Sequence, residues 1–420
     1  MSKIIIQNGN MCELDLPLKF AQKLYNEFAI RHPNAFYLRT RQRGMQNWDG
    51  KIHYITKTGQ FKIGLLPKVY DMCIEMGIKP KVVDMRQPLP KVSKVVTNIG
   101  KYKLRPEQEK AVKAVINNKI GNTPFHIGVL DYTVNAGKTL IMSSLYLSYK
   151  KQLKTLLITN DSDWLNQARE EFKQYLPGED ITFVQGKVLN WSNFTIGMVQ
   201  SISRNMRFYQ KELSQIDMVL IDEADQGGSK QYQNVITRLF NTRIRIGLSG
   251  TIYMSKLAKD MVKNMNLECF FGKVLAEFKL KDSIKKGYST KTVVKMVPGK
   301  PWYGNWESDC ISYKEIYDDS ITNCYTAWLM AYNRLLWNLN QGRYPALVVC
   351  KHIAHCENLY KFFKKKLGDA YNIAYVHVNT PSKLRQQIMK DFREGKIDIL
   401  VSTTIIARGK NFPKLRYLLN

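Results

Sequence analysis

The sequence is poor in acidic residues relative to basic ones. Its 420 residues contain 35 aspartates and glutamates against 64 lysines and arginines, so the formal net charge is +29. That balance predicts a polyanionic partner such as DNA, RNA or an anionic membrane, because lysine and arginine release condensed counterions when they bind phosphates. A generally basic soluble protein without such a partner is the alternative that charge alone leaves open.

Long apolar runs are also missing, which argues against a membrane protein. No stretch approaches the roughly 18–20 apolar residues of a transmembrane helix, and the opening run Ile4-Ile-Ile is too short for a signal peptide. The 7 cysteines are an odd, scattered number, unlike the framework of a disulfide-rich secreted domain. We therefore expect a cytoplasmic protein with reduced, buried cysteines and no membrane partner.

The chain is long enough for several domains, since one core rarely exceeds roughly 250–300 residues. Residues 1–85 mix strand-like and helical patterns, and the two prolines of Met85-Arg-Gln-Pro-Leu-Pro-Lys predict a linker. From Lys101 onwards, short β-branched runs alternate with helical segments, which predicts parallel sheets. We expect an α/β fold with an α+β accessory domain (1–85), a linker (86–100), a first α/β domain (101–280), and a connecting segment with a second α/β domain (281–420).

The clearest local signal is a phosphate loop, Tyr132-Thr-Val-Asn-Ala-Gly-Lys-Thr, followed by an apolar helix. The turn Asn135-Ala136-Gly137 can present backbone N–H groups to phosphate. Lys138 is expected to hold the β- and γ-phosphates of ATP, and Thr139 to ligate Mg²⁺. Tyr132 stands where the general pattern Gly-x-x-x-x-Gly-Lys-[Ser/Thr] has its first glycine. Taken alone, the loop leaves a chance Gly-Lys-Thr as the alternative.

An acidic turn follows the apolar run Met218-Val-Leu-Ile. Carboxylates at the carboxyl end of a strand lie where α/β sheets bind ligands. Asp222 is expected to hold Mg²⁺, and Glu223 to orient or deprotonate the attacking water. An ordinary acidic turn without a catalytic role is the alternative for this motif alone. That alternative becomes poor because the acidic motif follows the lysine loop along the chain, as a nucleotide site requires. Asp225 is expected to couple to a later motif.

The order of these motifs resembles a superfamily-two helicase over residues 101–420. The matching segments are Leu104-Arg-Pro-Glu-Gln108, Gly137-Lys138-Thr139, Thr159-Asn-Asp-Ser-Asp-Trp-Leu-Asn-Gln167, Asp222-Glu-Ala-Asp225 and Gly247-Leu-Ser249-Gly-Thr251. The resemblance implies two RecA-like motor domains that use ATP and Mg²⁺.

Further roles follow from the resemblance alone. Gln108 is implied to read the adenine edge, with Tyr102 as an added stacking ring. The hydroxyls of Ser249 and Thr251 are implied to exchange hydrogen bonds with Asp225. Contacts to one nucleic-acid strand are implied for Thr159, Gln167, Gln200 and Ser201, although a helix cap or a turn also explains either strand motif.

The second α/β domain contains a segment similar to the family's fifth motif, Val401-Ser-Thr-Thr-Ile-Ile-Ala-Arg-Gly-Lys-Asn-Phe-Pro. The resemblance implies that Thr403 and Arg408 contact nucleic acid. It also implies that Gly409 and Asn411 face a nucleotide bound between the two motor domains. Thr404 and Asn411 each stand where relatives often carry aspartate.

The segment Arg39-Thr-Arg-Gln-Arg-Gly-Met-Gln-Asn-Trp-Asp-Gly-Lys-Ile resembles the accessory domain of phage UvsW-type branch-migration helicases. Arg39, Arg41 and Arg43 can bind phosphates while Trp48 stacks on a base. A solvated arginine face with a buried Trp48 is an equal alternative. The resemblance implies branched DNA as the partner and, for a phage protein, the host cytoplasm as the location.

A zinc site at Cys350-Lys-His-Ile-Ala-His-Cys is a weaker hypothesis. Four potential ligands lie within this run, but no second cluster completes a separated Cys/His pattern. We favour core cysteines and turn histidines.

No late Gln-x-x-Gly-Arg-x-x-Arg motif follows residue 413, although such an arginine can accelerate hydrolysis by roughly 10³–10⁵. We expect a piece of a longer protein; the alternatives are a substitute such as Arg408 or Arg416, or a partner's arginine. If the chain is whole, we expect nucleotide binding with weakened hydrolysis and poor unwinding. The leading hypothesis is an ATP-dependent DNA helicase or translocase in recombination, repair or replication. An RNA helicase, a restriction motor subunit and a nucleotide-gated DNA clamp are the alternatives.

Overall fold

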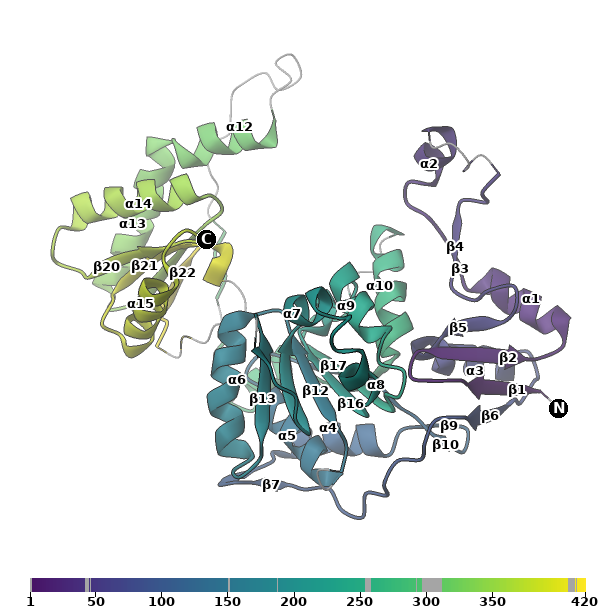
Figure 1. Cartoon of the computed structure of the whole chain (residues 1–420). Helices are drawn as coiled ribbons and strands as arrows, with labels where there is room; N and C mark the ends of the chain where they lie inside the picture. Colours follow the sequence, from purple (N-terminus) through teal and green to yellow (C-terminus); the bar gives the residue numbers. More distant parts are fainter. Residues whose placement is uncertain are drawn as a thin grey trace. The chain divides into compact units, whose positions relative to one another are not determined.

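The computed structural model describes residues 2–41, 45, 47–149, 152–186, 188–253, 258–291, 293–296, 312–406, 412 and 414–420. Contacts divide the chain into two compact units, Met1–Lys291 and Thr292–Asn420. Each unit is described by itself (Figure 1). Among the helices of the described ranges, none is long and apolar enough to cross a membrane.

The first unit begins with a four-stranded sheet in the order β5-β2-β1-β6. Its strands alternate in burial, so that Ile4 and Ile6 of β1 face the core while Lys3 and Ile5 are only half-buried. The elements are β1 (Lys3–Ile6), β2 (Met11–Asp15), α1 (Leu18–Glu27), β5 (Gln60–Lys62), η1 (Ile63–Leu65), α3 (Leu66–Glu75) and β6 (Lys81–Asp84). This small α+β sheet forms the amino-terminal part of the first unit.

A two-stranded antiparallel ribbon extends from that sheet. It consists of β3 (Ala29–Arg31) and β4 (Lys51–His53), and the chain between them carries α2 (Ala35–Arg41). Figure 1 shows α2 at the far end of the ribbon, away from the four-stranded sheet. We call residues 29–53 the arm.

The main sheet of the first unit has 8 strands in the order β14-β13-β15-β12-β16-β17-β11-β18. All neighbours are parallel except β13 and β14. The central strands are buried throughout, as expected for a parallel sheet covered on both faces. The strands are β11 (His126–Tyr132), β12 (Thr155–Thr159), β13 (Ile181–Gln185), β14 (Val188–Leu189), β15 (Phe194–Met198), β16 (Met218–Asp222), β17 (Ile244–Ser249) and β18 (Val274–Phe278).

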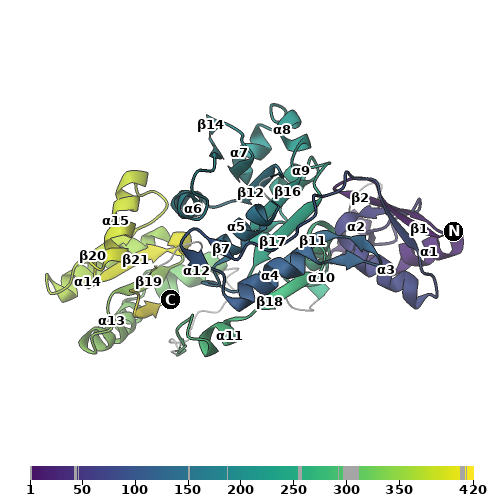
Figure 2. The ribbon, with the colours of Figure 1, turned by 90° about the horizontal axis from the view of Figure 1, so that it is seen from below.

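Helices cover both faces of the main sheet (Figure 2). One face packs against α4 (Pro106–Ile116), α5 (Lys138–Ser148) and α6 (Ser162–Tyr175). The other packs against α7 (Val199–Arg204), α8 (Gln210–Ser214), α9 (Lys230–Ile236) and α10 (Ala258–Phe271). The remaining elements are β7 (Asn98–Ile99), β8 (Tyr102–Lys103), β9 (Lys119–Ile120), β10 (Thr123–Pro124), η2 (Ala224–Gln226) and α11 (Leu280–Lys285).

The amino-terminal sheet and the main sheet share one hydrophobic core. A buried arginine of β17 also joins them: Arg245 donates hydrogen bonds to the Gly9 carbonyl (2.6 Å), to Asn10 Oδ1 (2.7 Å) and to the Phe270 carbonyl (3.2 Å). Gly64 packs so closely that a Cβ there would lie 2.1 Å from the Glu268 carbonyl oxygen. Residues before and after the predicted linker therefore belong to one compact unit, while the domain boundaries themselves stay predictions.

The second unit has a four-stranded parallel sheet in the order β20-β21-β19-β22. Helices α13 and α14 pack on one face and α15 on the other. Together the two parallel sheets confirm the α/β fold. The elements are α12 (Tyr313–Tyr317), the π-helix η3 (Asp318–Thr322), α13 (Tyr325–Asn340), β19 (Ala346–Cys350), α14 (Ile353–Leu367), β20 (Ile373–Val376), α15 (Ser382–Glu394), β21 (Ile399–Thr403), η4 (Thr404–Ile406) and β22 (Tyr417–Leu419).

The cysteines are free thiols wherever the structure describes them. The expectation of burial is confirmed for five, whereas Cys324 is only half-buried and Cys310 lies outside the described residues. The buried thiols are Cys12, Cys73, Cys269, Cys350 and Cys356.

Candidate functional site

The phosphate loop and the acidic turn meet at the carboxyl edge of the main sheet. Strands β16, β17 and β11 are consecutive neighbours in that sheet, and all three run parallel. The loop leaves β11, the acidic turn leaves β16, and the Gly-Leu-Ser-Gly-Thr segment completes β17. The structure therefore brings the predicted nucleotide-site motifs of the first unit together at one edge.

The phosphate loop has the backbone of an anion-binding turn. Asn135 and Gly137 adopt left-handed conformations, with φ of 63° and 73°, and Lys138 is the first residue of α5. Successive N–H groups before a helix N-terminus can surround a phosphate. A Cβ at residue 137 would lie 2.3 Å from Gln108 Nε2, so the positive φ favours glycine here and a larger residue would displace the Gln108 amide.

Helix α4 holds the loop from behind. The buried Gln108 side chain donates from Nε2 to the Ala136 carbonyl at 2.8 Å and accepts from the Arg105 N–H at 2.8 Å. Arg105 Nη2 donates to the Asn135 carbonyl at 3.2 Å. Gln108 thus positions the phosphate loop in this structure, and adenine reading stays a prediction.

Tyr132 explains why the loop lacks its first glycine. It is the last residue of β11, its side chain is fully buried, and its hydroxyl donates to the Glu107 carbonyl at 2.7 Å. Position 132 therefore belongs to the strand and to the contact with α4, and the turn begins after it.

The aromatic ring beside the loop is not the one expected. Tyr102 packs edge-on against Tyr175 of α6, with ring centroids 5.2 Å apart. Tyr288 instead lies against Arg105, whose guanidinium carbon is 4.2 Å from the ring centroid. Because Arg105 also contacts the loop, Tyr288 is a ring near the nucleotide site that motif spacing did not reveal.

Lys138 and Asp222 form the charged centre of the site. Lys138 Nζ lies 3.5 Å from Asp222 Oδ1. Burial raises the pKa of Asp222, while the ammonium of Lys138 acts in the opposite direction. Asp222 Oδ1 is buried and accepts no hydrogen bond from the described residues. A buried carboxylate oxygen with unused acceptor capacity next to a lysine fits a Mg²⁺–phosphate group, and Thr139 follows Lys138 at the start of α5.

The acidic turn is strained and tightly packed. Glu223 has φ of 52°, which is rare for a residue with a Cβ and is found at functional sites. A Cβ at Gly247 of β17 would lie 2.7 Å from the Ala224 Cβ. Ser249 donates from Oγ to Asp225 Oδ1 at 3.2 Å, and the Thr251 N–H donates to Ser249 Oγ at 3.1 Å. Ser249 therefore contacts Asp225 through its hydroxyl, whereas Thr251 reaches Ser249 through its backbone N–H, and the coupling role of these residues stays a prediction.

Tyr232 of α9 is a further residue near the acidic turn. Its side chain is buried, and its hydroxyl has no hydrogen-bond partner among the described residues. Burial, together with the carboxylates of the turn, raises the pKa of Tyr232. The sequence offers no signal for this residue, since it occupies an ordinary core position of an amphipathic helix.

Three of the four predicted strand-contacting residues of the first unit lie at neighbouring strand ends. Thr159 ends β12, and Gln200 and Ser201 follow β15, which pairs with β12. Gln200 Nε2 donates to the Asn160 carbonyl at 3.3 Å, and Ser201 Oγ accepts from the Gly186 N–H at 2.9 Å. Gln167 lies on α6, where Nε2 donates to Glu171 Oε1 at 2.7 Å. Their nucleic-acid contacts stay predictions.

The arm carries the predicted DNA-binding arginines. Arg39 and Arg41 are exposed on α2. Trp48 is half-buried, its Nε1 donates to the Lys51 carbonyl at 2.9 Å, and its ring lies edge-on to His32 with centroids 5.7 Å apart. Of the two alternatives for Trp48, these contacts favour packing within the arm.

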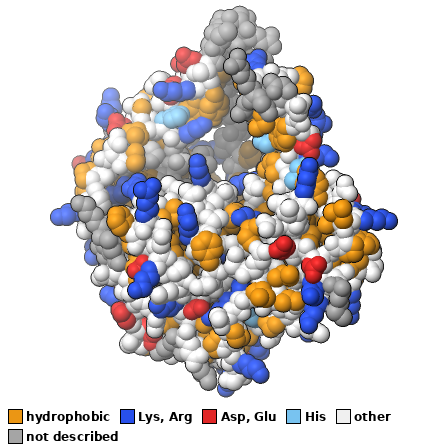
Figure 3. Space-filling view, turned by 45° about the vertical axis from the view of Figure 1, so that its right-hand side comes forward, with side chains coloured by type: hydrophobic (Ala, Val, Ile, Leu, Met, Phe, Trp, Pro, Cys, Tyr) orange, Lys and Arg blue, Asp and Glu red, His pale blue; other side chains and the backbone are white. Residues whose placement is uncertain are grey.

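One of the remaining predicted residues belongs to the second unit, and the others lie outside the described residues. Thr403 is buried at the carboxyl end of β21 in the second unit. Arg43, Arg408, Gly409 and Asn411 lie outside the described residues. Basic side chains are spread over the face shown in Figure 3, with acidic ones between them.

The cysteine–histidine run spans the end of β19 and the start of α14. A hydrogen bond to the Cys356 thiol and burial raise the pKa of Cys350, which disfavours the thiolate form that binds metals. Burial lowers the pKa of His355 from 6.5 to about 4, with His352 as a secondary cause. His355 is therefore neutral in the folded protein near pH 7.

His355 makes the stability of the second unit depend on pH. Below pH 6.5, His355 binds a proton in the unfolded chain but stays neutral in the folded chain until the pH approaches 4. The free energy of unfolding is therefore highest above pH 6.5 and declines as the pH falls towards 4. Lowering the pH from 7 to 5 is expected to remove about 2 kcal/mol. Hydrogen exchange of α14 amides would measure the change, and His355→Leu should abolish this part of it. Equal pH dependence in both proteins would contradict the expectation.

Two protein families match the chain. Residues 101–254 match the family described as the res subunit of type III restriction enzymes, and residues 329–420 match the helicase conserved C-terminal domain. The ATP-dependent RNA helicase CHR1 of Candida albicans is 23% identical over 218 residues, which are 50% of this chain and 31% of that protein. RhlB of Shewanella woodyi is 33% identical over 89 residues, or 21% of this chain and 20% of RhlB. The chain thus spans less than a third of the length of these curated relatives.

Solved structures show the same fold. UvsW of bacteriophage T4 aligns over 99% of this chain and 83% of its own, with 19% identity and a TM-score of 0.51. A variant of S. cerevisiae Dbp5 bound to RNA and ADP BeF3 aligns over 76% of this chain and 74% of its own, with 14% identity and a TM-score of 0.51. The two parallel-sheet domains are therefore RecA-like.

Proposed function

The chain belongs to the superfamily-two helicases, and we propose that it is an ATP-driven DNA helicase or translocase that acts on branched DNA. The observation that carries the motor function is the Lys138–Asp222 pair beside the phosphate loop. The preference for branched DNA is supported by the basic arm and by the alignment with T4 UvsW across nearly the whole chain. A phage-encoded enzyme of recombination, repair or replication in the host cytoplasm fits this proposal.

The proposed chemistry assigns a task to each residue at the sheet edge. Lys138 would bind the β- and γ-phosphates of ATP, while Thr139 and Asp222 would hold Mg²⁺, which would supply charge neutralisation at the phosphates. Glu223 orients the attacking water and accepts its proton. Gln108 keeps the loop in its phosphate-binding shape through the Ala136 carbonyl. The Ser249–Asp225 hydrogen bond links the acidic turn to the end of β17, so a change at the phosphate reaches a neighbouring strand.

RNA is the main alternative substrate, since CHR1 and RhlB are both named as RNA helicases. We expect ATP hydrolysis to be stimulated by DNA, most by forked DNA, and little by RNA of the same sequence. The assay compares single-stranded, duplex and forked DNA with matched RNA at one fixed salt concentration, because phosphate binding depends strongly on salt. Greater stimulation by RNA would overturn the proposal. Tight DNA binding without turnover would favour a nucleotide-gated clamp, and DNA cleavage a restriction-type motor.

A further inference from the structure

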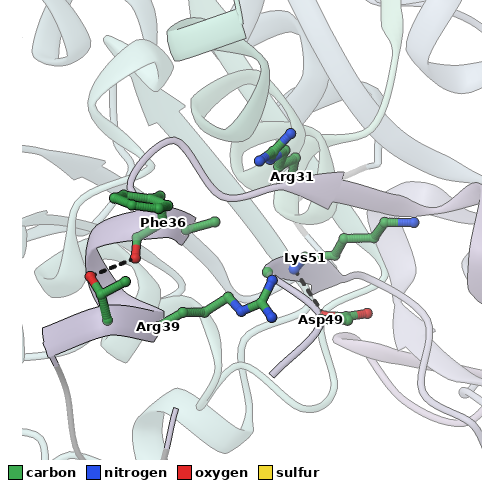
Figure 4. Close-up of a pocket in the computed structure, with 8 residues that line it drawn as sticks. Arg31, Phe36, Arg39, Asp49 and Lys51 are labelled. Carbon is green, nitrogen blue, oxygen red and sulfur yellow. Dashed lines mark hydrogen bonds between the residues drawn. The ribbon is translucent and has the colours of Figure 1, made fainter. Parts of the chain in front are cut away.

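The arm contains a pocket of about 510 Å³. Residues of β3, α2, the turn before β4 and the start of β4 line it, including Arg31, Phe36, Arg39, Asp49, Gly50 and Lys51. Figure 4 shows the Arg39 guanidinium reaching from α2 towards the turn that holds Asp49 and Lys51. One side chain of the pocket is aromatic and three are basic, which is the composition of a nucleotide-binding surface.

Phe36 is the most exposed of the aromatic side chains described in the arm. It is 79% exposed on α2, whereas Trp48 is half-buried and its indole N–H already donates to the Lys51 carbonyl. A base can stack on an exposed ring without any rearrangement of the arm. Phe36 is therefore the better stacking platform of the two.

The charge around the pocket favours phosphate. Arg31 and Arg39 are exposed and make no ion pair with a carboxylate in the described part of the chain. The one acid of the lining, Asp49, is engaged within its own turn, because it pairs with His53 Nε2 at 2.7 Å and accepts from the Lys51 N–H at 2.9 Å. The guanidinium groups of the pocket are thus available to an external anion.

Backbone and packing contacts within the arm hold the shape of the pocket. Gly50 has φ of 79°, and a Cβ at this position would lie 3.1 Å from the Ala35 Cβ. The His32 N–H also donates to the Gly50 carbonyl at 2.9 Å. These contacts fix the turn against the start of α2. As a result, Phe36 and Arg39 of α2 line the same pocket as the turn residues.

We propose that this pocket binds one unpaired nucleotide at the branch point of DNA, with the base stacked on Phe36 and the flanking phosphates bound by Arg31 and Arg39. The proposal rests on the proposed function, because it assumes that the arm meets branched DNA. It replaces Trp48 with Phe36 as the residue that contacts the base. Fully paired duplex offers no free base to this pocket and gains only the phosphate contacts.

The test uses a three-way DNA junction with one unpaired 2-aminopurine at the branch and a fully paired junction of the same length. Stacking on Phe36 is expected to change the 2-aminopurine fluorescence, and Phe36→Ala to weaken binding of the unpaired junction by about tenfold. Phe36→Tyr should restore both signals. Tyr37→Ala is the matched control, because Tyr37 is also exposed on α2, at 56%, but does not line the pocket.

The outcomes separate this inference from the proposed function. If DNA stimulates ATP hydrolysis but Phe36→Ala behaves like Tyr37→Ala, the pocket proposal is wrong and the motor proposal stands. If DNA fails to stimulate hydrolysis while the fluorescence still depends on Phe36, the motor proposal fails and the pocket remains. Displacement of the junction by free dAMP at equal concentration would show a mononucleotide site and overturn the proposal, as would equal binding of an RNA junction.

Discussion

Replacing Lys138 with alanine is expected to lower kcat for ATP hydrolysis by roughly 10²–10³-fold, the usual cost of removing one charge-stabilising donor from a preorganised site. Lys138 forms an ion pair with the buried Asp222, at 3.5 Å, and it is the first residue of α5, which follows the proposed phosphate loop. Without it, the charge that develops on the γ-phosphate loses its lysine partner. DNA binding by the arm should persist, because the arm lies on other elements.

Steady-state hydrolysis at saturating forked DNA measures the effect. Lys110→Ala is the matched control, since Lys110 is an exposed lysine on α4, and its kcat should match that of the unaltered protein. If the Lys138→Ala protein kept more than a tenth of the hydrolysis rate, the proposed role of the phosphate loop in hydrolysis would be wrong.

Replacing Arg245 with alanine is expected to lower the free energy of unfolding of the first unit by about 3–5 kcal/mol. Burial lowers the pKa of Arg245 to about 9, so the guanidinium remains charged near pH 7. Its partners are the Gly9 and Phe270 carbonyls and the Asn10 amide oxygen. The substitution leaves all three acceptors buried beside a cavity, and the two sheets lose the polar contacts that Arg245 makes between them.

Urea unfolding measures the loss, and hydrogen exchange localises it. Arg238→Ala, at an exposed position after α9, should change stability by less than about 0.5 kcal/mol. In Arg245→Ala, exchange should rise in the turn between β1 and β2 as well as in β17. A loss below about 1 kcal/mol, or one confined to β17, would contradict the role assigned to Arg245.

The alternation of apolar runs and helical segments predicts the parallel α/β fold, because a fully buried strand such as β16 begins with a continuous apolar run, Met218 to Ile221. The proximity of Lys138 and Asp222 could also be predicted from the sequence. Parallel strands bring their carboxyl ends to one edge, so motifs that follow strands must lie near one another. The roles of these residues stay predictions.

Other features depend on contacts that no local pattern encodes. Tyr132 stands in the place of a glycine because its hydroxyl reaches the Glu107 carbonyl, and sequence spacing cannot show that contact. Arg245 resembles any basic residue in a strand, yet two of its three partners, Gly9 and Asn10, lie more than 200 positions earlier. The exposure of Phe36 could not be predicted, because an exposed phenylalanine and a buried one look alike in a sequence.

The shared core of the first unit limits how this protein can be cut and recombined. Gly64 leaves no room for a Cβ against the Glu268 carbonyl, and Ile4 and Ile6 pack in the same cluster as Phe271. A graft of residues 1–85 onto another helicase would expose that apolar surface unless the acceptor supplied a complementary one. The arm at residues 29–53, whose tip stands away from this core, is the natural segment to exchange between relatives.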